Sequence, residues 1–582
     1  MWEFLKKLHL SVFGLSFIGF ILLTIVVLIA LFSGGKSTEN SILKITLDSP
    51  LVEHAPSSEP FAGKVDLPFS TFESKIGVIN TVKALQKAKI DSDIKSVFLE
   101  LGMVQGGLGQ VEEIRNAVLD FKKSGKKVIA YGDFFDEKAY YLASAADSVY
   151  LTSEAMLEFN GFVAEINFYK KTLKSIGIEP KIFRVGKFKG AVEPFMLDSI
   201  SKENKLQINE FLNSLHTTLL TQVAKSRKIQ IEELRNISNN LLVRNALQAV
   251  QYKLIDAVKY YDEVLDVLKK VSGVDAKSEI NFVDASTYWQ EPMNLNFGDQ
   301  IAVIVADGDI NMGENSEGEV GSNGTARLIR EARLDNNVKA IVLRINSPGG
   351  SALGSDIMWR EILKASESKP IIASMSSVAA SGGYYMAMAC DTIVAHESTI
   401  TGSIGVFGML FSAEDLLKNK IGIHTDRVKT GKFSDLGTPT RKMTIEDSLI
   451  IQTEVNTIYT SFITKAAKGR GMSIEQLDNV ASGRVWSGQK ARKIGLVDVI
   501  GDLDDAIAIA AKKAKVTSYE TVYYPRINSL WGTVESSYKQ ASLPKELKDI
   551  RESELYLYYN QIKKLNQMKG VQAKMPYDII VK

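Results

Sequence analysis

The feature that most constrains the fold of this 582-residue chain is an internal repeat. Five blocks of the first half recur in the same order in the second half, as in "SDIKSVFLELGMVQGGLG" and "NNVKAIVLRINSPGGSALG". The paired blocks begin at Ser41 and Asp299, Ser92 and Asn336, Ala139 and Gly383, Arg184 and Val428, and Tyr252 and Arg492. The offset between them drifts only by lengths typical of loops. Because chance similarity rarely keeps its order through five blocks, we interpret the chain as two tandem copies of one domain.

Each copy alternates short apolar runs with helix-like stretches. "IAVIVA", "KAIVLRIN", "KPIIASMSS" and "DTIVAH" are continuous apolar runs, as expected for strands covered on both faces of a sheet. Helix-like segments such as "GSDIMWREILKASES" separate them, and two long helical runs occupy matching places in the two halves, 201–228 and 444–471. The sequence therefore predicts an α/β fold with largely parallel strands and right-handed crossovers.

The N-terminal segment predicts a membrane anchor. Residues 9–32 contain no Asp, Glu, Lys or Arg. As a helix they would reach about 36 Å, more than the hydrocarbon core of about 30 Å. A cleaved signal peptide is the alternative, but its apolar region is usually shorter, and "LIALFSGGK" is a poor cleavage site. Lys6 and Lys7 predict that residues 1–8 stay in the cytoplasm, so that the remainder lies outside the cytoplasmic membrane.

The composition is that of a folded globular protein, with 45% hydrophobic and 24% charged residues. A net charge of +2 gives no electrostatic reason to expect a nucleic-acid partner. The single cysteine, Cys390, and the absence of an H-E-x-x-H motif lead us to expect no disulfide framework, metal or other cofactor. After the anchor we predict a linker at 33–46, an N-terminal repeat at 47–298 and a C-terminal repeat at 299–525. A tail at 526–582 has no assigned chemistry.

Alignment of the two copies singles out Ser381, the serine of "AASGGYY". A serine in this setting is either a helix cap or a nucleophile beside free backbone N–H groups. The aligned position in the first copy is Glu137, whereas Lys189 of "GKFKGA" aligns with Ser434 of "GKFSDL". Each copy thus carries one member of a Ser–Lys pair, and neither carries both.

Such a pair has a clear chemical use. A serine hydroxyl needs an adjacent base, and a lysine amine serves as a base only when neutral, a form that burial favours by lowering its pKa. The small and apolar neighbours of Lys189 suit that environment, although a solvated surface lysine is the alternative. A histidine base also stays open, since His396 and His424 lie in the same copy as Ser381.

An acyl-transfer site also needs donors for an oxyanion. Gly349 and Gly350 of "NSPGG" directly follow a predicted strand, where backbone without side chains can present N–H groups, although the same residues also suit a tight turn. Gly382 follows Ser381 and offers a second donor. Ser403 of "TGSIGVFG" is a small hydroxyl that could orient a neutral lysine.

The motifs "RVGKFKGAVEPF", "NSPGG", "AASGGYY" and "TGSIGVFG", behind one N-terminal span, resemble the long form of the signal peptide peptidase A family, the bacterial protease IV. The resemblance extends from the span to about residue 515. It implies a serine endopeptidase with two Clp-protease/crotonase-like domains. The family's nucleophile falls on Ser381, its general base on Lys189 and its lysine-orienting serine on Ser403. The oxyanion donors fall on Gly349–Gly350 and Gly382.

The resemblance also implies a setting for the enzyme. Long-form members assemble as tetramers on the outer face of the bacterial inner membrane and digest signal peptides left after secretion. We therefore expect apolar peptides as substrates, and the lipid bilayer and further copies of the chain as partners. Two alternatives remain from other classes: a crotonase-like enzyme acting on acyl-CoA, and a catalytically silent membrane scaffold.

Overall fold

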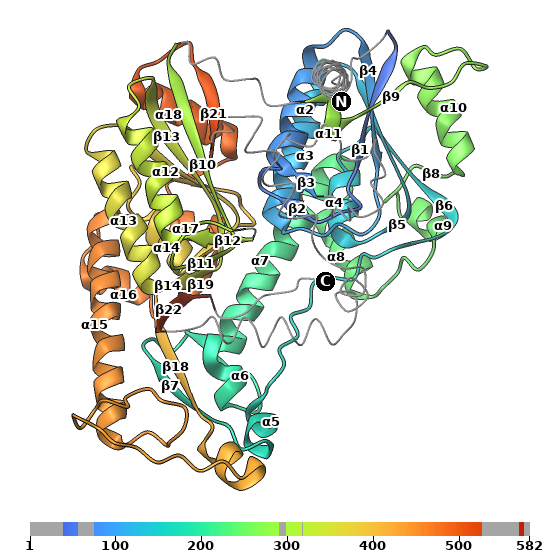
Figure 1. Cartoon of the computed structure of the whole chain (residues 1–582). Coiled ribbons are helices and arrows are strands. Elements are labelled where there is room, and N and C mark those ends of the chain that lie inside the picture. The colour runs from blue at the N-terminus through green and yellow to red at the C-terminus, as the bar shows by residue number, and fades with distance from the viewer. Residues whose placement is uncertain (1–38, 56–74, 290–297, 317, 526–569, 576–582) are drawn as a thin grey trace, which may run out of the picture.

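Two α/β units lie side by side in the computed structural model (Figure 1). The described residues are 39–55, 75–289, 298–316, 318–525 and 570–575. The predicted anchor at 9–32 and the preceding residues 1–8 lie outside these ranges. Among the helices within them, none combines the length and the apolar character that crossing a bilayer requires.

The first unit is a six-stranded parallel sheet in the order β8-β6-β5-β4-β1-β9. Its strands are β1 (Ser41–Thr46), β4 (Ile94–Glu100), β5 (Lys127–Phe135), β6 (Ser148–Leu157), β8 (Ala257–Val258) and β9 (Phe282–Asp284). β1 pairs with both β4 and β9, and its apolar side chains are buried. Residues 41–46 are therefore a strand of the first repeat and not part of a linker that ends at residue 46.

The second unit repeats this arrangement: the order β21-β10-β13-β15-β16-β20 matches β9-β1-β4-β5-β6-β8. Its strands are β10 (Gln300–Asp307), β13 (Val338–Ser347), β15 (Ile371–Ala380), β16 (Thr392–Ala395), β17 (Ile400–Gly402), β19 (Val485–Ser487), β20 (Val499–Ile500) and β21 (Glu520–Tyr524). All neighbours are parallel except β17 and β19. The four strands predicted from apolar runs are confirmed as β10, β13, β15 and β16.

Helices cover these sheets and connect their strands. The two long predicted helices are confirmed as α7 and α15, each starting at a capping hydroxyl, Ser201 or Thr444. The helices of the first repeat are α2 (Val78–Ile90), α3 (Leu108–Lys122), α4 (Glu137–Ala143), α5 (Lys170–Ser175), α6 (Glu193–Met196), α7 (Lys202–Arg227), α8 (Ile231–Asn239), α9 (Ala246–Gln251), α10 (Tyr261–Ser272) and α11 (Ala285–Tyr288). Those of the second are α12 (Ser322–Leu334), α13 (Ala352–Ser366), α14 (Gly382–Ala387), α15 (Ile445–Arg470), α16 (Ile474–Val480), α17 (Gly488–Lys493) and α18 (Leu503–Ala514).

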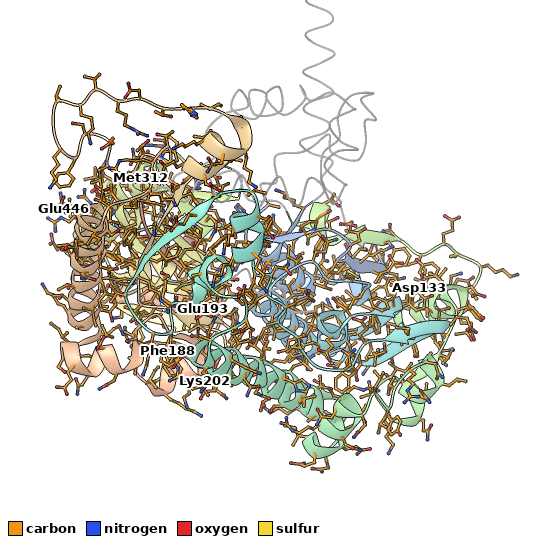
Figure 2. All side chains as sticks on the ribbon, turned by 90° about the horizontal axis from the view of Figure 1, so that it is seen from below. Asp133, Phe188, Glu193, Lys202, Met312 and Glu446 are labelled. Atoms are coloured by element: carbon orange, nitrogen blue, oxygen red, sulfur yellow. The ribbon has the colours of Figure 1, made fainter. Side chains whose placement is uncertain are left out.

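A third sheet crosses the boundary between the repeats. Its order is β12-β11-β14-β22-β18-β7, with β7 (Glu179–Arg184), β11 (Asp309–Asn311), β12 (Glu319–Gly321), β14 (Gly349–Ser351), β18 (Phe407–Ser412) and β22 (Val571–Lys574). The first-repeat strand β7 pairs antiparallel along the whole of β18. In Figure 2, Phe188, Glu193 and Lys202 mark the segment that continues from β7 beside the second repeat. Because β7 pairs with a strand of the second repeat, the residues that follow it, including Lys189, lie beside the second repeat and not beside the sheet of their own repeat.

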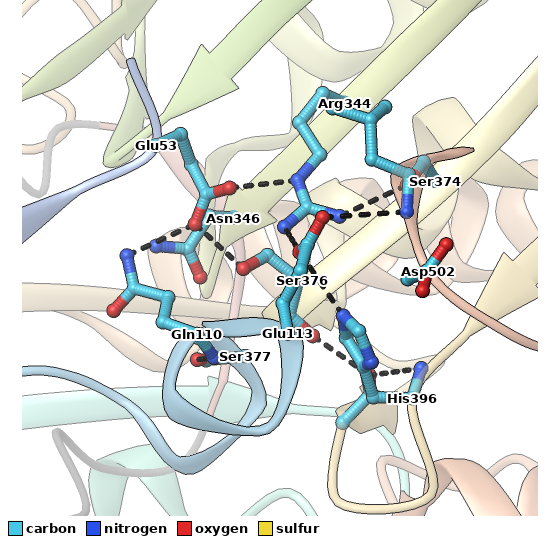
Figure 3. A network of polar contacts seen from close by, with 12 residues as sticks. Glu53, Gln110, Glu113, Arg344, Asn346, Ser374, Ser376, Ser377, His396 and Asp502 are labelled. Atoms are coloured by element: carbon cyan, nitrogen blue, oxygen red, sulfur yellow. Dashed lines mark hydrogen bonds and ion pairs between the residues drawn. The ribbon is translucent and has the colours of Figure 1, made fainter. Parts of the chain in front are cut away.

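A buried network of charged side chains joins the two units (Figure 3). Arg344 of β13 has no exposed surface, and its guanidinium donates to Glu53 Oε2 at 2.7 Å and pairs with Glu113. Both carboxylates belong to the first repeat. His396 Nε2 lies 3.2 Å from Glu113 Oε2, and Gln110 Nε2 donates to Glu53 Oε1 at 2.9 Å. Because a buried charge without its partner is strongly destabilising, this network favours one relative position of the repeats.

Candidate active site

Ser381 lies at the corner where β15 ends and α14 begins. Its side chain is fully buried, and its backbone has φ +55° and ψ −108°, a sparsely populated conformation for a residue with a Cβ. Its N–H donates to the carbonyl of Gly402 at 2.8 Å, which helps to hold this geometry. The hydroxyl makes no capping bond to α14. Ser381 thus occupies the N-cap position of α14, as the helix-start interpretation expected, but its hydroxyl caps nothing and is available for another partner.

That partner is Lys189, from the other repeat of the same chain. Its Nζ lies 2.8 Å from Ser381 Oγ although the two residues are 192 positions apart. The same nitrogen lies 3.0 Å from Ser403 Oγ and 3.1 Å from the Ser403 carbonyl oxygen. The pairing of β7 with β18 places the Lys189 amine at the second repeat. Lys189 and Ser381 are therefore in contact within one subunit.

The surroundings of Lys189 favour the neutral amine. The side chain has no exposed surface, and burial lowers its pKa well below the ordinary value of 10.5. The nearest carboxylate in sequence, Glu193, is directed elsewhere: it accepts from Ser201 Oγ at 2.5 Å and from Asn204 Nδ2 at 3.0 Å. The alternative of a solvated surface lysine is therefore wrong.

Backbone contacts that the sequence analysis missed hold the lysine in place. A Cβ on Gly483, which has φ +80°, would lie 2.7 Å from both the backbone nitrogen and the Cβ of Lys189. Phe188 N donates to the carbonyl of Ser482 at 3.0 Å, and Gln207 Nε2 donates to the carbonyl of Phe188 at 2.9 Å. Only the glycine in "ASGRVW" hinted at this support, because these partners lie far apart in the sequence.

Ser403, the serine expected to orient the lysine, contacts the Lys189 amine. It is buried with φ +49°, and its N–H donates to the carbonyl of Arg484 at 2.7 Å. Its Oγ lies 3.4 Å from the carbonyl oxygen of Gly483, to which the hydroxyl can donate. Its oxygens are then free to accept hydrogen bonds from Lys189.

Two of the predicted oxyanion glycines, Gly349 and Gly382, lie against each other next to Ser381. An ideal Cβ on Gly349, which has φ +96°, would lie 2.6 Å from the backbone nitrogen of Gly382, so the turn and the start of α14 are in close contact. Gly349 N donates to Ser347 Oγ at 3.2 Å. Its N–H therefore already has an acceptor within the turn.

The other candidates lie elsewhere. His396 contacts Glu113 in the network between the repeats, His424 is exposed, and neither is a hydrogen-bond partner of Ser381. Ser434, which aligns with Lys189, lies in an exposed loop. Across the described ranges, no cluster of three or more His, Cys, Asp or Glu side chains could hold a metal ion.

The first repeat has a different group at the position of Ser381. Glu137 is buried at the start of α4, where its Oε1 accepts from Gly161 N at 2.6 Å and its Oε2 has no partner among the described residues. Burial raises the pKa of this carboxyl to about 7. The first repeat therefore contributes Lys189 to the candidate site in the second repeat, and has a glutamate, not a serine, at its own position equivalent to Ser381.

Comparison with known proteins identifies the family. The model of peptidase family S49 matches residues 120–275 and 364–517, one match in each repeat and together more than half of the chain. The chain belongs to peptidase family S49. As an S49 member it is a serine peptidase, and the family resemblance drawn from its motifs is confirmed.

Three relatives illustrate the range of S49 proteins similar to this one. Protease 4 of Salmonella typhi is 33% identical over 90% of this chain and 87% of its own length. The chloroplastic serine protease SPPA of Arabidopsis thaliana is 35% identical over 87% of this chain and 75% of its own. A putative signal peptide peptidase SppA of Enterococcus faecium is 35% identical over 34% of this chain and 57% of its own. The first two matches span most of the chain, including both repeats.

Proposed function

We propose that this S49 peptidase is a membrane-anchored endopeptidase that hydrolyses cleaved signal peptides and other apolar peptides with a Ser381–Lys189 dyad. The observation that carries the proposal is the distance of 2.8 Å between Lys189 Nζ and Ser381 Oγ in a fully buried setting. A neutral amine at hydrogen-bond distance from a serine hydroxyl is the arrangement that general-base activation requires.

In this proposal the neutral Lys189 amine divides its hydrogen bonds between Ser403 and Ser381. A neutral amine has two N–H donors and one lone pair. The donors serve Ser403 Oγ and the Ser403 carbonyl oxygen, and the hydroxyl of Ser403 donates onward to the carbonyl of Gly483. The lone pair is then directed to the remaining neighbour, the hydroxyl of Ser381. Ser403 is thus a positioning residue that fixes the amine with its lone pair toward the nucleophile.

The reaction follows from this arrangement. Lys189 takes the proton of Ser381 as Oγ bonds to the carbonyl carbon of a bound peptide, and the backbone N–H groups of Gly350 and Gly382 stabilise the oxyanion. The C–N bond breaks when the lysine ammonium returns its proton to the leaving amine. Water, deprotonated by Lys189, then hydrolyses the acyl-enzyme and restores Ser381.

The substrate and setting rest on the relatives and the sequence. The Enterococcus faecium relative is named a signal peptide peptidase. Residues 9–32 supply an apolar anchor, with residues 1–8 in the cytoplasm and the catalytic part on the outer face of the inner membrane. An anchored enzyme is suited to apolar, membrane-bound peptides. Assembly as a tetramer belongs to the same proposal and would be read from the mass of the purified complex.

Single substitutions in the full chain test the dyad. Ser381→Ala and Lys189→Ala should each reduce cleavage of an apolar peptide by about 10³-fold or more, while circular dichroism shows that each variant is folded at the assay temperature. Ser434→Ala and Lys187→Ala are matched controls, because both side chains are exposed and neither reaches the site. Full activity in either dyad variant would refute the mechanism. Binding of coenzyme A without peptide cleavage would favour the acyl-CoA alternative, and inactivity in every assay would favour a scaffold.

A further inference from the structure

The short helix α14 begins at the candidate nucleophile and has little support of its own. It comprises only Gly382–Ala387, and its N-cap, Ser381, has a sparsely populated backbone conformation and makes no side-chain cap. Tyr385 N donates to the carbonyl of Ser381 at 2.8 Å, which ties these two residues together. Because a helix this short is marginal without tertiary contacts, the position of Ser381 depends on what the side chains of α14 bind.

The internal repeat shows which contacts of α14 belong to the fold. Tyr384 Oη donates to the carbonyl of Leu496 at 3.0 Å. In the first repeat the aligned Tyr140 of α4 donates to the carbonyl of Leu254 at 2.8 Å. Both copies make this contact although only the second carries the nucleophile, so we assign it to the stability of the fold.

Tyr385 contacts an acid whose counterpart in the first repeat is engaged elsewhere. Its hydroxyl donates to Asp356 Oδ1 of α13 at 2.8 Å, and Lys465 of α15 pairs with the same carboxylate. The counterpart of α13 is α3, which also has 15 residues and follows a glycine turn, and Glu112 stands there at the position of Asp356. Glu112 accepts from Ser398 N at 3.2 Å and so contacts the other repeat.

The bond between Tyr385 and Asp356 joins the two elements that carry the proposed oxyanion donors. α13 directly follows β14, which contains Gly350, and α14 starts at Gly382. The two helices approach closely, because a Cβ on Gly382 would lie 2.6 Å from Ser355 Oγ of α13. Asp356 is the next residue of α13, so its bond to Tyr385 holds the first turn of α14 against the start of α13.

Burial and charge favour this contact. Tyr385 is only 3% exposed, and burial raises its pKa, so the phenol keeps its proton and donates to the carboxylate. Lys465 Nζ, which lies 4.2 Å from the centroid of the Trp359 ring, keeps the charge of Asp356 paired. The Tyr385 ring packs on Phe462, with ring centroids 4.5 Å apart. A phenylalanine at position 385 would therefore keep the packing and lose the hydrogen bond to α13.

We propose that Tyr385 and Asp356 are positioning residues of the peptidase reaction, whose hydrogen bond places Ser381 Oγ and the Gly382 N–H relative to the glycine turn. The inference rests on the proposed function, because Ser381 and Lys189 perform the chemistry. A misplacement of about 1 Å at reacting groups can cost about 10²-fold in rate. Loss of the hydrogen bond should therefore lower kcat and leave peptide binding unchanged.

Steady-state cleavage of an apolar peptide by variants of the full chain tests the proposal. Tyr385→Phe should lower kcat about tenfold and change KM less than about twofold. Tyr141→Phe is the matched control, because Tyr141 aligns with Tyr385 and is also buried, and it should keep both values. Asp356→Ala should reproduce the loss, and Asp356→Asn, which retains an acceptor oxygen, should restore most of the activity. The double variant Tyr385→Phe/Asp356→Ala should be no worse than either single variant.

A peptide aldehyde separates positioning from a general loss of structure. Ser381 Oγ adds to its carbonyl carbon as Lys189 takes the hydroxyl proton, which places an oxygen at the proposed donors, whereas the matching peptide alcohol only binds. In Tyr385→Phe the inhibition constant of the aldehyde should rise about tenfold, and that of the alcohol should change less than about twofold. The pH midpoint of kcat/KM should stay at the native value, because the Lys189 amine contacts Ser381 and Ser403 and not Tyr385.

The outcomes separate this inference from the function on which it rests. Native kcat in Tyr385→Phe and Asp356→Ala, a rise in KM alone, an equal loss in Tyr141→Phe, or equal weakening of aldehyde and alcohol would overturn the positioning role and leave the dyad intact. If Tyr385→Phe does not fold, Asp356→Ala decides, because the Asp356 side chain is 41% exposed and tolerates replacement. A native enzyme without activity on any peptide would overturn both proposals.

Discussion

Replacing Arg344 with methionine should destabilise the protein by about 3–5 kcal/mol at neutral pH. The guanidinium is fully buried and pairs with both Glu53 and Glu113. Methionine retains much of the apolar volume but leaves two buried carboxylates without their counter-charge. Burial by itself raises the pKa of Glu113, yet Arg344 and His396 outweigh this effect and bring it to about 2.

The loss of stability should depend on pH with a definite sign. In the native protein the lowered pKa of Glu113 stabilises the fold above the unfolded pKa of 4.5, and this contribution is lost as the pH falls through 2. In the variant, burial is less opposed and raises the folded pKa. The folded variant then binds a proton more readily, so the deficit should be smaller near about pH 5 than near about pH 7.5.

Urea unfolding of the full chain at these two pH values measures the difference in the free energy of unfolding. Arg327→Met is the matched control, because Arg327 is exposed and its pairs with Glu314 and Glu331 should contribute less than about 1 kcal/mol. A loss below about 1 kcal/mol in Arg344→Met, or an equal loss at both pH values, would refute the role given to the buried network.

Three further predictions concern the site and its counterpart in the first repeat. Gly483→Ala should displace Lys189 and lower kcat/KM by about 10²-fold, whereas Gly471→Ala, which has φ +62° and open space, should leave kcat/KM unchanged. The kcat/KM for peptides should rise with pH as Lys189 loses its proton, and a midpoint at or above 10.5 would contradict the pKa lowering by burial. Glu137→Gln should stabilise the protein by up to about 3 kcal/mol at about pH 8, because burial raises the carboxyl pKa from 4.5 to about 7 and the cost of ionising it grows through that range. Near about pH 4.5 the gain should vanish, and an equal gain at both pH values in thermal unfolding would argue against this origin.

Much of the fold was predictable because its signals are local. Continuous apolar runs mark strands covered on both faces, and they correctly located β10, β13, β15 and β16. The first repeat begins before residue 47, where its start was predicted. Its first strand, β1, combines apolar residues with Ser41, Lys44 and Thr46, so its sequence has a weaker pattern of a buried strand.

The sequence by itself determined the duplication. Through the alignment of the two copies it also singled out Ser381, which the first copy lacks, and Lys189, which the second copy lacks. Only the tertiary structure decided that they meet within one chain. Their contact depends on β7 pairing with β18 and on Gly483 and Gln207 holding the loop. The physical reason is that hydrophobic periodicity reports which face of an element is buried, whereas strand pairing between repeats and the matching of buried charges depend on partners hundreds of residues away.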